Sequence, residues 1–358
     1  MKPKRVFGSK YRKAGGYTSN SFPIGVDPRL AKVLSEAANC SLSKGTWQNY
    51  ATAVKHIKKM NTEWGTRVRF PFTEDMVYNY VGYLLHRGMK PQTVRSYLAA
   101  IRHRHRELGY CGDSMNPVLL DAVLNGERNW NNQQRLARER MPITRCMLLE
   151  LKHWIRLNVK MSVDKARLWT ICTWLWWGSF RGRELLGESS STFNAEDTLL
   201  GCDVTMKTLM VNKEKVRMVI VTLKTAKETR GKATEVELLE NGGQTCPVAA
   251  FLAWMKLLKK RPERELPLFR KESGKIVTTE DMNKILKSVF AESITATKFV
   301  SVHSFRSGMA SEMARSGYGD EEIQIQGRWS SESYLKYIKL GRAQKIGSQL
   351  KLSKTLSC

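Results

Sequence analysis

The chain has 358 residues, of which 60 are lysine or arginine and 33 are aspartate or glutamate, so its formal net charge is +27. A hydrophobic fraction of 42% is enough for buried cores, and this length predicts about two domains. So large a positive excess favours a polyanionic partner, and nucleic acid is the leading candidate. An anionic membrane surface is the weaker candidate, because no long basic amphipathic helix has a clean lipid-facing side.

The sequence excludes several classes of protein. The longest apolar stretch, Leu168 to Phe180, is too short to span a membrane and contains two threonines. The N-terminal segment has no apolar run, so we expect no secretory signal. Seven scattered cysteines without a CxxC pair argue against a disulfide framework or a zinc site and indicate a reducing, intracellular compartment.

Residues 1–27 are basic and rich in glycine and serine, which predicts a flexible arm. The KPKR motif in this arm is typical both of a nuclear import signal and of a segment that binds phosphates, and both interpretations stay open. The first interpretation predicts a nuclear protein.

Residues 28–132 have the apolar periodicity of a small all-helical domain. Thr73 and Pro91 are typical of helix starts. The helix that begins at Pro91 carries an apolar stripe on one side and arginines on the other, together with His103 and His105. This basic side is either a solvated face or a surface that contacts phosphates, and the net charge favours the second. The candidate DNA-binding residues are Lys44, Arg95, Arg102, Arg104 and Arg106.

Residues 133–142 are polar and charged and predict a linker, and residues 143–340 form a second domain of mixed character. The predicted fold class is therefore mainly α with a small antiparallel β-sheet. Helices are expected at 145–158, 164–178, 247–260, 279–290, 303–316, 320–327 and 331–340, and strands at 204–211, 216–223 and 233–238.

Two arginines have a context that suggests chemistry. Arg181 follows the tryptophan-rich apolar helix where the chain turns, so its guanidinium either is presented at the surface or pairs with Glu184. His303 and Arg306 are three residues apart in the first turn of a helix, and both therefore point the same way. Ser301 is expected to cap that helix, whose N-terminus would attract phosphate.

These motifs and a third, GRWSSESYLKYIK at 327–339, form an ordered set. The set comprises R-x-x-E-L after an apolar helix, a lysine on a β-turn, H-x-x-R, and G-R-W with a tyrosine eight residues after the tryptophan. It resembles the tyrosine recombinases of the phage-integrase superfamily. The last motif is most similar to the recombinases of eukaryotic DIRS-like and Ngaro-like retrotransposons.

The resemblance implies that Tyr337 is a nucleophile. Tyr334 lies on a turn nearer the start of the same short helix, where its ring is expected to pack against the body of the domain. Trp329 stands where many relatives have histidine, so it can donate a hydrogen bond but cannot transfer a proton. The lysine is Lys224 or, with less support, Lys227, because LKTAK fits the turn in either register. The implied catalytic set is Arg181, Lys224, His303, Arg306, Trp329 and Tyr337, with Arg181 and Arg306 as the phosphate clamp.

The implied function is site-specific DNA recombination or integration through a covalent 3′-phosphotyrosyl intermediate, without metal, ATP or another cofactor, for the movement of a mobile element. The resemblance also implies a two-domain clamp on double-stranded DNA, with residues 28–132 as the helical core-binding (SAM-like) domain and 143–340 as the catalytic domain. It further implies a tetramer on two duplexes, with residues 341–358 as a possible subunit-exchange segment. We expect no membrane and no small-molecule substrate. A type IB topoisomerase, or a non-catalytic DNA-binding descendant of a recombinase, is the alternative.

Overall fold

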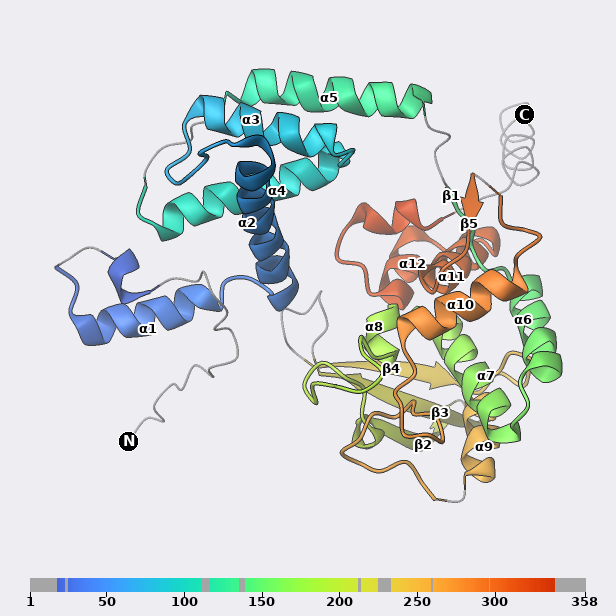
Figure 1. The fold of residues 1–358 in the computed structure, drawn as a ribbon. Coiled ribbons are helices and arrows are strands. Elements are labelled where there is room, and N and C mark those ends of the chain that lie inside the picture. Colours follow the sequence, from blue (N-terminus) through green and yellow to red (C-terminus); the bar gives the residue numbers. More distant parts are fainter. Residues whose placement is uncertain are drawn as a thin grey trace, which may run out of the picture. The chain divides into compact units, whose positions relative to one another are not determined.

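The structure, a computed structural model, describes residues 18–22, 25–110, 116–134, 139–211, 214–224, 233–258, 260–295 and 297–338. The chain divides into two compact units, Met1–Leu136 and Ala137–Cys358, which are taken here one at a time (Figure 1). The predicted fold class, mainly α with a small antiparallel sheet, is confirmed. Within the described ranges, no helix combines the length and the apolar character that a membrane crossing requires.

The first unit is helical. Its α2 begins where the Ser43 hydroxyl accepts a hydrogen bond from the Thr46 N–H, and its α4 begins with Pro91, which has no N–H to satisfy. Apolar residues of α2, α3 and α4 form one core, in which Leu84 and Ile101 are fully buried. The elements are a 3₁₀ turn η2 (Ser19–Ser21) and helices α1 (Pro28–Asn39), α2 (Lys44–Trp64), α3 (Glu74–His86), α4 (Pro91–Glu107) and α5 (Pro117–Gln134).

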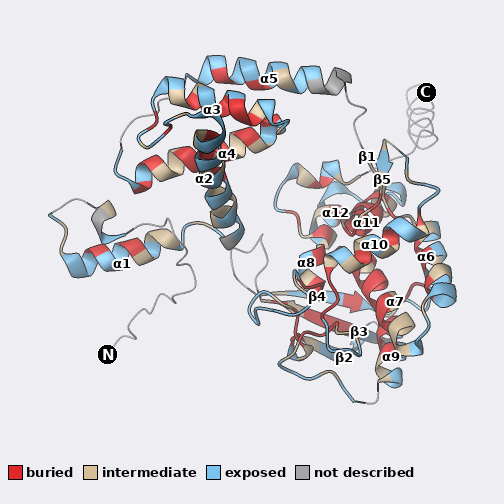
Figure 2. Cartoon of the chain, viewed as in Figure 1, coloured by how far each residue is buried: buried red, intermediate tan, exposed pale blue. Residues whose placement is uncertain are grey.

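The second unit holds a larger core between helices and a three-stranded sheet (Figure 2). Its helices are α6 (Arg145–Asn158), α7 (Ser162–Trp177), α8 (Gly182–Leu185), α9 (Pro247–Leu257), α10 (Thr279–Val289), α11 (His303–Arg315) and α12 (Asp320–Gly327), with 3₁₀ turns η3 (Gly201–Asp203) and η4 (Glu332–Lys336). Its strands are β1 (Glu139–Arg140), β2 (Val204–Val211), β3 (Glu214–Leu223), β4 (Thr234–Leu239) and β5 (Lys298–Phe299).

Two sheets organise the second unit. Strands β2, β3 and β4 are antiparallel neighbours in chain order, with Val204 opposite Val221 and Met218 opposite Leu239. The short strands β1 and β5 pair in parallel, with Arg140 opposite Phe299. This second pairing brings the start of the unit alongside the segment that leads into α11.

Helix α7 forms the centre of the second core, because almost every residue of its second half is buried (Figure 2). Its tryptophans also satisfy polar backbone groups of neighbouring segments. Trp174 Nε1 donates to the Pro247 carbonyl at 3.3 Å, and Trp176 Nε1 donates to the Ile143 carbonyl at 2.9 Å. The helix ends at Gly178, and the chain that follows is therefore fixed on a rigid support.

Helix α11 packs closely against the start of the unit. A Cβ atom placed on Gly308 would lie 2.0 Å from the Ile143 carbonyl oxygen, which is far inside van der Waals contact. The same carbonyl accepts the Trp176 hydrogen bond. Only glycine therefore allows α11, α7 and the segment after β1 to meet in this way.

Two local predictions need correction. The domain bounds stay predictions, although strand β1 lies within the predicted linker 133–142 and η2 lies within the predicted arm 1–27, of which residues 1–17 and 23–24 are outside the described residues. The predicted helix 331–340 is the 3₁₀ turn η4, Glu332–Lys336, and its last two residues lie outside the described part. Ser301 does not cap α11 through its hydroxyl. Val302 is the N-cap residue, and the Ser301 N–H donates to Ser304 Oγ at 3.1 Å.

Candidate active site

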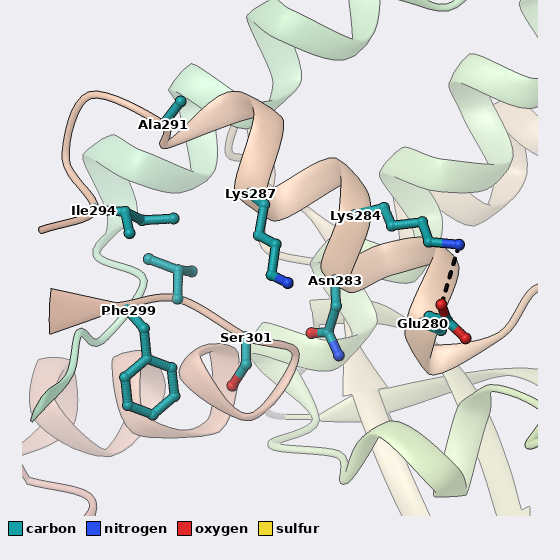
Figure 3. Close-up of a pocket in the computed structure, with 9 residues that line it drawn as sticks. Glu280, Asn283, Lys284, Lys287, Ala291, Ile294, Phe299 and Ser301 are labelled. Carbon is teal, nitrogen blue, oxygen red and sulfur yellow. Dashed lines mark ion pairs between the residues drawn. The ribbon is translucent and has the colours of Figure 1, made fainter. Parts of the chain in front are cut away.

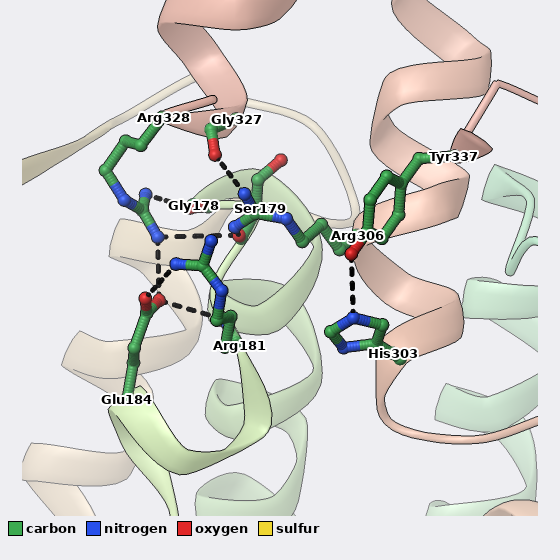
Figure 4. Close-up of polar contacts among 9 residues, drawn as sticks. All are labelled: Gly178, Ser179, Arg181, Glu184, His303, Arg306, Gly327, Arg328 and Tyr337. Atoms are coloured by element: carbon green, nitrogen blue, oxygen red, sulfur yellow. Dashed lines mark hydrogen bonds and ion pairs between the residues drawn. The ribbon is translucent and has the colours of Figure 1, made fainter. Parts of the chain in front are cut away.

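Arg306 lies in a polar cluster that three segments of the second unit build together (Figure 4). Its side chain is fully buried, and its Nη1 donates to the Ser179 carbonyl at 2.6 Å while its Nη2 donates to the Gly327 carbonyl. The guanidinium also lies over the Trp329 ring, 4.3 Å from the centroid. A guanidinium has five N–H donors, so these two bonds leave three for a further acceptor.

Arg181 and Arg328 share the carboxylate of Glu184 (Figure 4). Arg181 Nη1 lies 2.8 Å from Glu184 Oε1, and Arg328 Nη2 lies 2.8 Å from Glu184 Oε2. The Arg181 N–H also donates to this carboxylate at 2.8 Å, which closes the first turn of α8. The pairing of Arg181 with Glu184, which the sequence left open, is therefore present, and it fixes the direction of both guanidinium groups.

Sequence reasoning missed Arg328. This residue has a left-handed backbone, with φ of 53°, directly after the glycine that ends α12. Its Nη1 donates to the Gly178 carbonyl at 2.7 Å, and its guanidinium lies over the Phe180 ring. These partners precede it by about 150 positions, so no local pattern could reveal them.

His303 and Tyr337 meet at the edge of the cluster. His303 Nε2 lies 3.0 Å from Tyr337 Oη, within hydrogen-bond distance. The main chain of Tyr337 is held separately, because its carbonyl accepts hydrogen bonds from the hydroxyls of Ser307 at 2.7 Å and Ser311 at 3.2 Å. Tyr337 remains partly accessible at the end of η4, and a hydroxyl and a possible base are therefore presented together.

Tyr334, the other tyrosine of this segment, belongs to a small core. It is 3% exposed and packs with Ala310, Ile323 and Trp329. The prediction that its ring lies against the body of the domain is confirmed.

The electrostatics of the cluster keep His303 neutral. Burial lowers its pKa to about 4, and the positive charges of Arg140, Arg306 and Arg181 add to that effect. Burial and the neighbouring arginines also lower the pKa of Arg306, to about 10, which still leaves its guanidinium charged near pH 7. A neutral imidazole beside a tyrosine hydroxyl can accept its proton, whereas an imidazolium cannot.

The stability of the protein should respond to acid through His303. The unfolded chain binds a proton at His303 near pH 6.5 and the folded chain only near pH 4, so between these values acid favours the unfolded state. The stabilising contribution is complete above about pH 6.5 and is lost as the pH falls through about 4. Urea unfolding of the wild type and of His303→Gln should show a stability difference that shifts in favour of the variant on acidification. The exposed His153→Gln serves as the control, and identical pH profiles for His303→Gln and wild type would contradict the assignment.

Lys224 is not part of the cluster in this structure. Its Nζ lies 2.7 Å from Asp203 Oδ2 and donates to the Ala195 carbonyl at 2.8 Å. Asp203 is buried and also accepts the Leu200 N–H, so the lysine is held by a structural carboxylate. Lys227 lies outside the described residues.

The candidate nucleic-acid contacts of the first unit are partly engaged within the chain. Arg95 forms an ion pair with Asp121 of α5, and Arg104 Nη1 lies 2.9 Å from Glu107, whose carboxylate is almost fully buried. These two arginines therefore stabilise the packing of α4 in addition to contributing to its positive charge. The remaining candidates are Arg102, which is half-buried, Arg106, which is exposed, and Lys44, whose side chain lies outside the described residues.

His105 does not lie on the basic side of α4, as the sequence analysis placed it. It is buried, and its Nε2 accepts the Phe72 N–H at 2.9 Å. Its position four residues after the buried Ile101 continues the apolar stripe, which is the physical reason for the error. His103 is also largely covered, by the ring of Trp47 among others.

A separate cavity lies between α10 and the β5 segment (Figure 3). Its volume is about 560 Å³. Lys284 at its rim forms an ion pair with Glu280 at 3.1 Å, and Phe299 forms part of its apolar side. None of the six predicted catalytic residues lines it, so the cavity is distinct from the arginine cluster.

Comparison with known proteins identifies the fold. No protein-family model matches the chain, and no curated protein matches its sequence. The Tn1549 transposon integrase in complex with transposon right end DNA superposes with a TM-score of 0.55 at 13% identity, covering 87% of this chain and 94% of the integrase chain. The XerH site-specific recombinase bound to palindromic difH substrate superposes with a TM-score of 0.54 at 12% identity, covering 91% and 82%. The chain therefore has the fold of tyrosine recombinases, as the sequence motifs predicted, while the retrotransposon subgroup stays a prediction.

Proposed function

We propose that this chain is a site-specific DNA recombinase or integrase that cleaves and rejoins strands through a covalent 3′-phosphotyrosyl intermediate. The observation that carries the proposal is the 3.0 Å contact between Tyr337 Oη and His303 Nε2, beside the charged guanidinium of Arg306. Metal-free attack on a phosphodiester needs these groups: a hydroxyl, a neutral base and fixed positive charge. Two proteins of the same fold, solved as DNA complexes, support double-stranded DNA as the substrate.

In the cleavage step, Tyr337 Oη attacks the phosphorus, an O–P bond forms, and the bond from phosphorus to the 5′ oxygen breaks. His303 takes the hydroxyl proton as the bond forms. Arg306 and Arg181 stabilise the negative charge that develops on the non-bridging oxygens. Trp329 supports Arg306 with its ring face, in addition to the neutral N–H donor that its indole offers.

The leaving 5′ oxygen needs a proton, and a lysine is the proposed acid. Lys224 can donate this proton only after its ammonium leaves the Asp203 carboxylate. The bound DNA phosphate therefore has to replace Asp203 as the partner of the ammonium. Rejoining is the same step reversed. A 5′-hydroxyl attacks the phosphotyrosyl bond and releases Tyr337, and no ATP is required because that bond replaces the one that was cut.

The finer assignments belong to the same proposal. The resemblance of the 327–338 motif to DIRS-like and Ngaro-like recombinases supports a role in mobile-element integration or excision in a nucleus. The likeness to a transposon integrase supports the same role. We also propose a homotetramer on two duplexes, with residues 341–358, which lie outside the described residues, as the segment exchanged between subunits.

The test is to trap the covalent adduct. Selection from a pool of randomised duplexes first supplies a binding site, and a nick near each candidate scissile phosphate then prevents rejoining. We expect an adduct that survives SDS and forms equally with and without EDTA. Binding without any adduct would indicate a non-catalytic DNA-binding protein. Relaxation of supercoiled DNA without sequence preference would indicate a topoisomerase, and adduct formation that requires added Mg²⁺ would contradict the mechanism.

A further inference from the structure

The chain segment 139–143 runs beside the segment that leads into α11. The Glu139 N–H donates to the Thr297 carbonyl at 2.6 Å, the Met141 N–H donates to the Phe299 carbonyl at 2.9 Å, and the Ile143 N–H donates to the Ser304 carbonyl at 2.9 Å. The last of these bonds reaches the residue next to His303. Arg140, the fourth residue of the second unit, is therefore held firmly beside the start of α11.

The side chain of Arg140 lacks the partners that the other arginines of the region have. Its guanidinium lies over the Phe299 ring, with 5.4 Å between Cζ and the centroid. Its Nε is buried and has no hydrogen-bond acceptor, which is also true of the Nε atoms of Arg306 and Arg328. No described carboxylate forms an ion pair with it, whereas Arg181 and Arg328 both contact Glu184. A desolvated donor without an acceptor is costly, and a role in binding an ion or in catalysis is one of the explanations for such a group in a native protein.

The sign of the charge around His303 identifies the class of that ligand. Four arginines act on this region, Arg140, Arg181, Arg306 and Arg328, against one carboxylate, Glu184, which pairs with Arg181 and Arg328 only; the excess is three positive charges. Of the arginines that disfavour protonation of His303, Arg140 has the largest effect. Since β1 pairs with the strand that leads into α11 and Ile143 bonds to the residue next to His303, the charge of Arg140 acts close to His303, and the ligand that fits is an anion.

We propose that Arg140 is a further phosphate-binding residue of the active site, which contacts the DNA phosphate that Tyr337 attacks. This inference rests on the proposed function. It adds to the implied phosphate clamp a guanidinium from β1, which lies within the segment predicted as a linker. Stacking on Phe299 holds the guanidinium plane in place, so that little freedom is lost when the phosphate binds.

Arg140→Met tests the proposal, because it keeps the length and the contact with Phe299 but removes the charge and the donors. We expect adduct formation on a normal phosphate to fall by about 10²–10³-fold, the scale of losing one preorganised donor. On a substrate with an uncharged methylphosphonate at the scissile position, the variant should come within a few-fold of wild type, because the charge that Arg140 neutralises is absent. Arg183→Met, which alters an exposed arginine of α8, should match wild type on both substrates.

Unchanged cleavage by Arg140→Met on the normal phosphate would overturn the proposal, and so would an equal loss on both substrates, which would indicate a structural role. If the wild type forms no adduct, the proposed function fails, and binding of inorganic phosphate decides the inference separately. Phosphate should then shift the His303 ring resonances of the wild type and of Arg183→Met, and Arg140→Met should need about tenfold more phosphate. Equal affinity in all three proteins would refute the phosphate site.

Discussion

Replacing Tyr337 with phenylalanine is expected to abolish the covalent adduct while DNA binding stays unchanged. The substitution removes only the hydroxyl, and the ring remains packed near Trp329 at 5.1 Å between centroids. The main-chain contacts to Ser307 and Ser311 do not involve that hydroxyl either. Loss of a nucleophile costs on the order of 10⁶-fold in rate, so adduct formation should fall below detection in a gel assay.

Tyr334→Phe is the matched control, because it removes a hydroxyl three residues away. Tyr334 is 3% exposed, and its hydroxyl interacts with Asp320 on α12. The variant should keep the adduct, because the ring and its packing in the small core stay in place. Peptide mapping of the trapped complex gives the direct answer. A phosphotyrosyl peptide at Tyr334, or an adduct in Tyr337→Phe, would show that the wrong tyrosine was assigned.

Removing the buried guanidinium of Arg306 is expected to destabilise the second unit by about 2–5 kcal/mol. Arg306→Met would leave the Gly327 carbonyl without its donor and the Ser179 carbonyl with only the long 3.4 Å bond from Arg328, at about 1–3 kcal/mol for a lost buried bond, and would remove the stacking on Trp329. Arg306→Lys should recover only part of the lost stability. Its ammonium is still a charged donor, but it cannot reach both carbonyls in the geometry of the guanidinium. Calorimetry of the full chain would measure the shift in the transition of this unit.

Arg315→Met on the same helix provides the control for that measurement. Arg315 is exposed and pairs with Glu312, and exposed pairs of this kind contribute at most about 1 kcal/mol. Equal stability of Arg306→Met and Arg315→Met would show that Arg306 has no structural role and that its carbonyl contacts are incidental. If Arg306→Met alone is strongly destabilised, part of any decrease in its DNA cleavage comes from unfolding of the protein, and cleavage has to be compared at equal amounts of folded protein.

Periodicity and caps predicted most of the fold, because these signals are local. Helices 145–158, 303–316 and 320–327 were placed within a residue of the observed bounds, and strand 204–211 matches. The end of the second unit was harder, since the composition of residues 331–340 suits either a helix or a short 3₁₀ turn such as η4. His105 was placed on the wrong side because its residue type outweighed its spacing from Ile101.

The candidate site also has a part that local sequence patterns predict and a part that they do not. The spacing of His303 and Arg306 on one helix turn was sufficient to predict that they lie together. The ion pair of Lys224 with Asp203 and the sharing of Glu184 by Arg328 join residues far apart in the chain. No periodicity encodes such contacts. They depend on how completed elements pack, and only the folded structure reveals them.

The glycine at 308 limits how this chain can diverge. A single methyl group at that position would collide with the Ile143 carbonyl, which lies three residues after Arg140 and also accepts the Trp176 bond. Substitutions at exposed surface positions should leave the fold intact. Alanine at position 308 would instead force β1 or α11 to move, and the position of His303 at the start of α11 would change with it. In a large mutational library, position 308 should therefore tolerate almost no replacement, although it touches no proposed substrate.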